Sequence, residues 1–345
     1  MRKIVGLVVV LALVVGGAAA VLHRRSARAP RTTPLAAGPA ATTTTTATTP
    51  PRPPIAPLTG LPDASGAAQR RPALTIKIEN TPEALPQYGI DEADVVYEEI
   101  VNGGITRLAA VFNSRAPTKV GPVRSVRPTD QQVVWPLGGI FAFSGGAPYA
   151  IASIEQAPVK LVQESGAGAA MFRDYARQAP HNLYASAPGL FAFGGSPTPP
   201  RPLFAYRRGA AAVAGARVAS FVVQFPSIYS VTWAWNTSTL AWDRSIFGQP
   251  LVTGTGVRVA PQNVVVMWVN YVNGVGTFSS YANLQGSGAA AVFTDGREVR
   301  GTWSRAASKS DPLTYHATSG ATIALTPGQT WVELLNVGAN LSVTP

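Results

Sequence analysis

Arginine and lysine side chains are concentrated in one short part of the sequence. Residues 107 to 127 contain five cations and no acidic residue, although only 13% of the chain is charged. They are Arg107, Arg115, Lys119, Arg124 and Arg127. Guanidinium groups bind phosphates and carboxylates through paired N–H donors. We expect the Gly121–Pro122 step to open a turn whose backbone amides face an anion together with Arg124, Ser125 and Arg127.

A block of acidic residues precedes these cations. Residues 91 to 99 contain five carboxylates, namely Asp91, Glu92, Asp94, Glu98 and Glu99. Blocks of opposite charge so close in sequence can pair with each other, and a bidentate bridge between Arg124 and Glu98 is one example. The arginines therefore have two interpretations, an internally paired corner of the fold or a site for a bound anion.

One histidine stands in a polar segment that could contribute to chemistry. His181 and Asn182 lie in the stretch "RDYARQAPHNLY", directly after a proline. A histidine acts as a base when a carboxylate or a substrate hydroxyl lies beside it, and it otherwise bonds to backbone as a structural residue. An enzyme of this kind would use Glu98 or Glu99 as acid or base, with His181 assisting and Arg107, Arg124 and Arg127 holding the substrate.

Several kinds of chemistry are excluded by composition and spacing. The chain has no cysteine, which excludes disulfides, thiolate nucleophiles and cysteine metal sites. Its three histidines, His23, His181 and His316, are far apart and form no pair with the spacing of a metal-binding helix. Neither a nucleophile elbow nor a phosphate-binding loop occurs. We expect neither a metal nor a cofactor.

The net charge of +11 is unevenly distributed along the chain. Seven of the 28 Lys and Arg residues, and none of the 17 Asp and Glu residues, precede residue 58. The rest carries 21 cations against 17 anions, a net charge of about +4. Because the excess belongs mainly to the amino-terminal tail, we do not expect nucleic-acid binding.

The amino-terminal tail has the pattern of an exported protein. Residues 1–28 contain a cationic start and nineteen uncharged, mostly aliphatic residues, Ile4 to Leu22, which is typical of a membrane anchor or a signal peptide. Residues 29–56 are rich in Thr and Pro and contain almost no large apolar side chain. Such a segment stays extended as a linker. We expect the remainder to lie outside the cytoplasmic membrane, anchored by this segment or secreted after its cleavage.

Two folded domains are expected beyond the linker, at 57–208 and 209–345. The first contains alternating apolar segments at 72–80, 93–101 and 105–113, which predict strands. An Asn-Gly-Gly sequence between the last two favours a hairpin, with a short helix near residue 93 as the alternative. The chain is predicted to be α+β, with a mixed amino-terminal domain followed by a β-rich, mainly antiparallel carboxyl-terminal domain.

The carboxyl-terminal domain is rich in β-branched and aromatic runs separated by Gly, Asn and Asp. An Asp-Gly pair at 295–296 predicts a hairpin turn. Six tryptophans lie in this part, and exposed ones would suit sugar stacking, whereas packing in a β core is the alternative that we favour. They are Trp233, Trp235, Trp242, Trp268, Trp303 and Trp331.

A series of short motifs resembles a known family. "PLTGLP", "YEEIVNGGITRLAAVF", "KVGPVRSVRP", "APHNLY", "GTWSR" and "GQTWVELL" occur in the order and rough spacing of the DUF3048 family, the YerB-like lipoproteins of the bacterial cell envelope. The resemblance implies an extracytoplasmic protein of two domains held at a membrane, and no settled activity. It also implies a lipid-bearing cysteine in many relatives, an acidic residue where this chain has Asn102, and a histidine near Phe143 or Ser144. This chain has none of the three.

These observations predict an extracytoplasmic envelope protein that binds an anionic envelope ligand or a protein partner. The candidate binding residues are Glu98, Arg107, Arg124, Ser125, Arg127, His181 and Asn182. A hydrolase or transferase acting on cell-wall polymers is the alternative, and the two differ in whether Glu98, Arg124 and His181 line one pocket.

Overall fold

The computed structural model describes residues 52–194, 198–209, 213–226 and 229–345. Residues 1–50 and 51–345 form separate units, and the fold below is that of the second. The expected anchor or signal peptide lies outside the described residues, as does the linker up to residue 51. Among the residues that are described, no helix is long and apolar enough to cross a membrane.

The three strands predicted near the amino terminus are confirmed. They are β1 (Leu74–Glu79), β2 (Val95–Ile100) and β3 (Thr106–Phe112), and β3 pairs antiparallel with both others. A 3-10 turn, η4 (Asn102–Gly104), joins β2 to β3, with Gly103 at a φ of 80°. The parallel strands β4 (Ile140–Phe143) and β5 (Lys160–Gln163) extend the sheet beyond β1.

Strands from the carboxyl-terminal part continue the same sheet, whose order is β18-β17-β16-β14-β20-β2-β3-β1-β4-β5. The Asp295–Gly296 hairpin between β16 and β17 is confirmed, and both residues have the positive φ that such a turn requires. The bounds are β14 (Asn263–Val272), β16 (Gly286–Thr294), β17 (Arg297–Arg305), β18 (Thr314–Ala317) and β20 (Thr330–Asn336), with β15 (Tyr281–Asn283) on β14 and β9 (Ala216–Arg217) on β17.

A five-stranded sheet packs against one face of this large sheet. Its strands are β13 (Gln249–Pro250), β12 (Ala241–Ile246), β11 (Ser230–Asn236), β10 (Ser220–Gln224) and β21 (Leu341–Thr344). Phe221 of β10 stacks on Phe293 of β16 with ring centroids 3.6 Å apart. Trp233, Trp242, Trp303 and Trp331 are buried, so the core interpretation holds for four of the six tryptophans.

Helices are short and few in the described part of the chain. The α-helices α1 (Pro128–Val134) and α2 (Pro148–Ile154) cover Phe141 and Phe143 of β4, while α3 (Ala187–Phe191) contacts β1 and β4. The remaining elements are η1 (Ala67–Gln69), η2 (Pro82–Ala84), η3 (Ile90–Glu92), η5 (Glu164–Gly166), η6 (Gly168–Ala170), and the paired strands β6 (Met171–Arg173) with β7 (Leu183–Ala185) and β8 (Ala205–Tyr206) with β19 (Ala324–Leu325).

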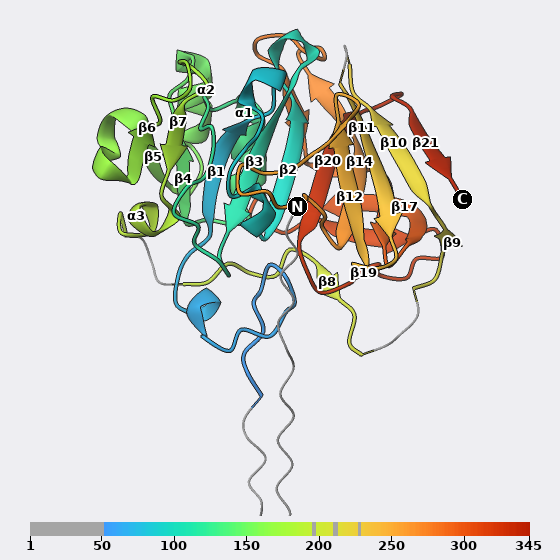
Figure 1. The fold of residues 1–345 in the computed structure, drawn as a ribbon. Helices are drawn as coiled ribbons and strands as arrows, with labels where there is room; N and C mark the ends of the chain where they lie inside the picture. Colours follow the sequence, from blue (N-terminus) through green and yellow to red (C-terminus); the bar gives the residue numbers. More distant parts are fainter. Residues whose placement is uncertain (1–51, 195–197, 210–212, 227–228) are drawn as a thin grey trace, which may run out of the picture. The chain divides into compact units, whose positions relative to one another are not determined.

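The described part of the chain is therefore mostly β, and its helices lie between residues 67 and 191. Figure 1 shows β2 and β20 side by side, where strands from the two parts of the chain meet. Because β20 pairs in parallel with both β14 and β2, the predicted domains share one sheet. Whether residues 57–208 and 209–345 fold separately stays a prediction.

A buried arginine joins the two sheets. Arg244 of β12 is fully buried, and its Nη2 donates to the Glu98 carboxylate on β2. Its guanidinium also lies over the Trp331 ring at 4.6 Å. Glu333 of β20 is the register neighbour of Glu98, and burial together with the charge of Glu98 raises the pKa of Glu333 well above its ordinary value. Arg244 thus pairs with the Glu98 carboxylate between the sheets, and the raised pKa of Glu333 favours its neutral form beside them.

Replacing Arg244 tests this role. Arg244→Met should lower the free energy of unfolding by about 3–5 kcal/mol, because it leaves a buried carboxylate unpaired. Urea denaturation at neutral pH measures the change. Arg217→Met, which alters an exposed arginine of β9, should cost less than about 0.5 kcal/mol. Equal stability of the two variants would contradict the role.

Candidate functional site

The register of three strands aligns charged residues on one face of the sheet. Arg107 of β3 is opposite Glu79 of β1 on one side and Glu99 of β2 on the other. Directly opposite residues project to the same face, and so does Lys77, two residues before Glu79. The strand pattern alone therefore gathers four charged side chains beside α1.

A fully buried ion-pair network lies between this face of the sheet and α1. The Lys77 ammonium donates to Glu99 and lies 2.8 Å from Asp130 Oδ1 of α1. Asp130 Oδ2 also accepts the backbone N–H of Arg127 at 2.7 Å, which fixes the start of α1. Burial and the nearby charge of Glu99 raise the pKa of Asp130 to about 6, while Lys77 acts in the opposite direction. Two carboxylates share one ammonium here.

Two arginines lie together without a carboxylate partner. Arg107 is 6% exposed, and its Nη1 donates to the carbonyl of Ser125 at 3.0 Å. Arg127 donates to the Asn102 side-chain oxygen from Nε at 3.1 Å and from Nη2 at 2.9 Å. Burial, then the charges of Arg127 and Arg124, lower the pKa of Arg107 to about 9. Neither guanidinium forms an ion pair with any carboxylate that the structure describes.

A third arginine and the histidine meet at one buried carboxylate. Glu79 Oε2 lies 2.9 Å from His181 Nδ1, and Glu79 Oε1 lies 3.3 Å from Arg124 Nε. Thr81 Oγ1 donates to the same Oε1 at 3.2 Å. Arg124 and His181 keep about a quarter of their side-chain surface exposed, 22% and 25%. Glu79 therefore orients both side chains while they remain accessible.

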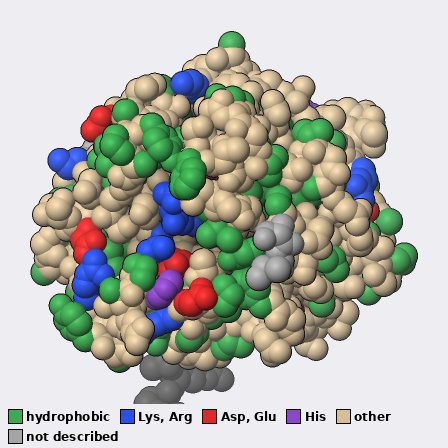
Figure 2. Space-filling view, turned by 90° about the horizontal axis from the view of Figure 1, so that it is seen from above, with side chains coloured by type: hydrophobic (Ala, Val, Ile, Leu, Met, Phe, Trp, Pro, Cys, Tyr) green, Lys and Arg blue, Asp and Glu red, His purple; other side chains and the backbone are tan. Residues whose placement is uncertain are grey.

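Charged, histidine and hydrophobic side chains gather on the face that Figure 2 shows. Tyr149, which lies close enough to Arg127 for their charges to interact, is 42% exposed and donates its hydroxyl to the carbonyl of Phe278 at 2.5 Å. Phe278 is 74% exposed. The N–H of Gly103 donates to the carbonyl of Gly276, so the loop between β14 and β15 borders the turn that carries Asn102. These aromatic side chains thus border Arg107, Arg124 and Arg127, which we call the arginine cluster.

The structure separates Glu98 from the other predicted site residues. The expected Arg124–Glu98 bridge is wrong, because Glu98 pairs with Arg244 while Arg124 contacts Glu79. Glu98 and Glu99 are adjacent on a strand and therefore project to opposite faces. Glu98 consequently does not share a pocket with Arg124 and His181, and it is too deeply buried to reach a substrate there.

Two further expectations need correction. The backbone amides expected to face an anion are already used, since those of Gly121, Val123 and Arg124 donate to carbonyls of neighbouring segments. Asn182 lies next to His181 but accepts from Arg173 at 2.8 Å, outside the cluster. Ser125 does belong to the cluster, with its hydroxyl 3.5 Å from that of Ser144.

Sequence reasoning missed Lys77, Glu79, Asn102 and Asp130. A signal existed for the first two, because the alternation of "LTIKIE" places them on one face of the predicted strand. That this polar face is buried depends on α1 and on residues 121–127, which no local pattern shows.

Models of one protein family match both parts of the chain. The amino-terminal domain described as "Protein of unknown function (DUF3048)" matches residues 58–195, and the corresponding carboxyl-terminal domain matches residues 221–332. The chain belongs to the DUF3048 family. The predicted resemblance is confirmed.

A relative and a solved structure of this family are similar to the chain. The protein named "Putative lipoprotein YerB" of Bacillus subtilis (strain 168) is 35% identical over 133 residues, which cover 38% of this chain and 40% of that protein. The crystal structure of YerB protein from Bacillus subtilis matches with a TM-score of 0.72 at 24% identity, over 84% of this chain and 99% of that one. The second likeness shows a shared fold.

The uncharged side chain at position 102 contacts Arg127 of the arginine cluster. The resemblance implied an acidic side chain there in relatives. In this chain the Asn102 amide oxygen accepts two N–H groups of Arg127 and adds no negative charge, so that the carboxylates acting on Arg127 are Glu99 and Asp130.

The raised pKa of Asp130 gives a pH-dependent prediction. Between pH ~4 and ~6 the folded state binds more protons at Asp130 than the unfolded state, so this contribution to stability falls as pH rises. Asp130→Asn should remove that slope while keeping an acceptor for the Arg127 N–H. Urea denaturation across this range measures it.

Asp174→Asn is the matched control for that series. A hydrogen bond from Lys119 lowers the pKa of Asp174, so its replacement should change the slope only at lower pH. An unchanged slope in Asp130→Asn between pH ~4 and ~6 would show that Asp130 does not titrate there.

Proposed function

We propose that this protein is an extracytoplasmic envelope protein that binds an anionic ligand at Arg107, Arg124 and Arg127. The observation that carries the proposal is that Arg107 and Arg127, two mostly buried guanidinium groups, lie together and that neither forms a contact ion pair with a described carboxylate, although the charges of Glu99, Glu79 and Asp130 act on them from farther away. Burying like charges together is unfavourable unless a counter-charge arrives. A bound anion supplies that charge.

Unused donors support the same proposal. A guanidinium carries five N–H donors. Arg107 directs one hydrogen bond to a described partner, the carbonyl of Ser125. Because Arg107 has a pKa of about 9, it keeps its charge at neutral pH. Phosphate and carboxylate groups of the envelope fit this planar donor geometry, and the exposed part of Arg124 extends it.

The envelope location rests on sequence and family. Residues 1–56 have the composition of an exported leader and linker, and a relative in the family carries the name of a lipoprotein. Residues 52–345, where the structure describes them, contain no helix suited to span a membrane. We propose that the amino-terminal segment holds the protein at the membrane or is cleaved on export.

A second candidate function rests on the contact between Glu79 and His181. A carboxylate bonded to Nδ1 fixes the imidazole so that Nε2 faces outward as a base, and Arg124 beside it could hold an anionic substrate. The enzyme alternative therefore uses His181 with Glu79 rather than Glu98 or Glu99. Binding without turnover needs only the arginines and remains the function that the geometry supports best.

Inorganic phosphate tests the binding proposal. At about 100 times its dissociation constant, phosphate should stabilise the fold by ~2.7 kcal/mol and raise the melting temperature by roughly 5 °C. Arg127→Gln should lose most of this rise, and Arg127→Lys should keep part of it, because an ammonium retains the charge without the planar fork.

Arg173→Gln is the matched control, since Arg173 pairs with Glu164 at the surface. It should respond to phosphate like the wild type. The binding proposal fails if phosphate leaves the wild-type melting temperature unchanged, or if Arg127→Gln responds as fully as the control.

The location is tested by protease added to intact cells that lack an outer membrane. The folded unit should be degraded without lysis, because the leader and linker place it outside. Protection until lysis would contradict export. The length of the mature chain in the same samples distinguishes a retained anchor from a cleaved leader.

A further inference from the structure

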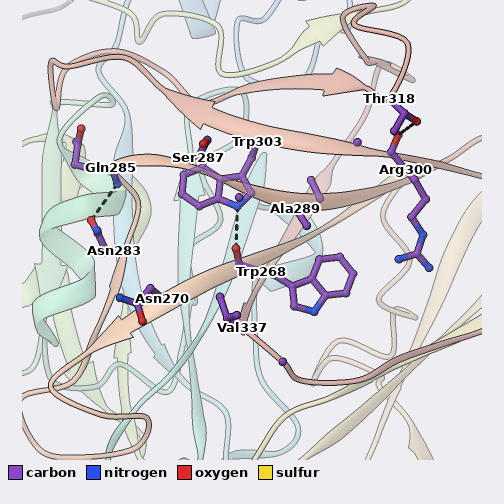
Figure 3. A pocket seen from close by; sticks show the side chains of 14 residues that line it. Trp268, Asn270, Asn283, Gln285, Ser287, Ala289, Arg300, Trp303, Thr318 and Val337 are labelled. Atoms are coloured by element: carbon purple, nitrogen blue, oxygen red, sulfur yellow. Dashed lines mark hydrogen bonds between the residues drawn. The ribbon is translucent and has the colours of Figure 1, made fainter.

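A second concave site lies on the carboxyl-terminal part of the large sheet. Its volume is about 610 Å³, within the ~300–1,000 Å³ range of small-ligand pockets. It is lined by residues of β14, β15, β16 and β17 and by the turn after β20, and it shares none of them with the arginine cluster. Figure 3 shows these side chains around the opening.

Small residues create the space. The floor includes Gly288, Ala289, Ala290 and Gly301, although strands usually carry larger side chains. At Gly288 the glycine is required by close packing, because a Cβ there would lie 2.6 Å from both the Trp268 carbonyl oxygen and Nε1 of the buried Trp303. The stretch "GSGAA", which has the composition of an ordinary turn, is instead the strand β16 that forms this floor.

Trp268 supplies rigid aromatic surface, and the buried Trp303 supports the strand that carries it. Trp268 Nε1 donates to the carbonyl of Ala339 and Trp303 Nε1 donates to the carbonyl of Trp268, each at 3.0 Å. With both indole N–H groups bonded inside the protein, the rings are fixed in place. Trp268, which is half-buried, lines the pocket with the Arg300 guanidinium 5.8 Å from its ring centroid, and the 66%-exposed Val337 lies at the rim.

The polar groups of the pocket are amides and hydroxyls. They belong to Asn270, Asn283, Gln285, Ser287 and Thr318. Gln285 Nε2 is buried and has no hydrogen-bond partner among the described residues, so an amide donor is left over. Arg300 is the one charged residue of the lining, and it is paired with Glu298 at 2.5 Å. The lining is thus mostly apolar and nearly neutral, with amide and hydroxyl groups at a few points, unlike the arginine cluster.

We propose that this pocket binds a pyranose ring of an uncharged, N-acetylated glycan. The C–H face of a sugar packs on an indole ring, and side-chain amides exchange hydrogen bonds with its hydroxyls and acetamido group. The acetamido methyl fits over the alanine floor. A neutral glycan also needs no counter-charge, which agrees with the paired state of Arg300.

N,N′-diacetylchitobiose is the probe, with maltose as a disaccharide that lacks acetamido groups. Titration followed by tryptophan fluorescence and by NMR should show saturable binding of the first and weaker binding of the second. Trp268→Ala should weaken binding about tenfold or more. Because this change also removes the bond to Ala339, Ala289→Phe is the second variant, which fills the floor and leaves Trp268 in place.

Trp235→Ala, at a half-buried tryptophan of the five-stranded sheet, is the control and should bind like the wild type. Arg127→Gln should also bind the disaccharide normally, so that the glycan proposal and the anion proposal are tested independently. No binding at millimolar disaccharide would overturn the proposal, as would full binding by Ala289→Phe. Tighter binding of an uncharged tripeptide such as trialanine would also overturn it, in favour of a peptide site.

Discussion

The two-residue period of a single strand governs where this protein keeps its buried charges. Glu98 and Glu99 are consecutive on β2, and they project to opposite faces of the large sheet. Glu98 accepts a hydrogen bond from Arg244 and so links the large sheet to the five-stranded sheet. Glu99 accepts a hydrogen bond from Lys77 on the face that carries the arginine cluster. A shift of β2 by one residue would exchange these faces and leave both networks unpaired. Stability and the candidate site thus depend on one register.

The balance of charge on the Glu99 face explains why an anion is the expected ligand. Lys77 is shared by Glu99 and Asp130, and Glu79 is shared by Arg124 and His181. Arg107 and Arg127 remain, each held by neutral oxygen atoms. Neutral acceptors fix the guanidinium groups in position but do not cancel their charge. Arg107 and Arg127 therefore present oriented donors whose charge is only partly balanced, by Glu99, Glu79 and Asp130.

Local sequence patterns predict much of this fold and part of this site. Alternation identified β1, β2 and β3, the Asp-Gly pair identified the turn between β16 and β17, and the density of cations identified Arg107, Arg124 and Arg127. The same alternation, applied to residues 98 and 99, would have separated these carboxylates. The partners could not be predicted, because Arg244 is 146 positions from Glu98 and His181 is 102 positions from Glu79. Such contacts follow from strand order, which a single sequence does not specify.

A crystal of the protein soaked in selenate tests the central claim most directly, because selenate resembles phosphate in size and scatters anomalously. The account predicts an anomalous peak within hydrogen-bond distance of the guanidinium groups of both Arg107 and Arg127, at about 2.7–3.0 Å from their nitrogen atoms. The account would be contradicted by a map in which the cluster is well ordered, no peak is present, and Arg107 and Arg127 keep only their contacts to Ser125, Asn102 and the Val126 carbonyl.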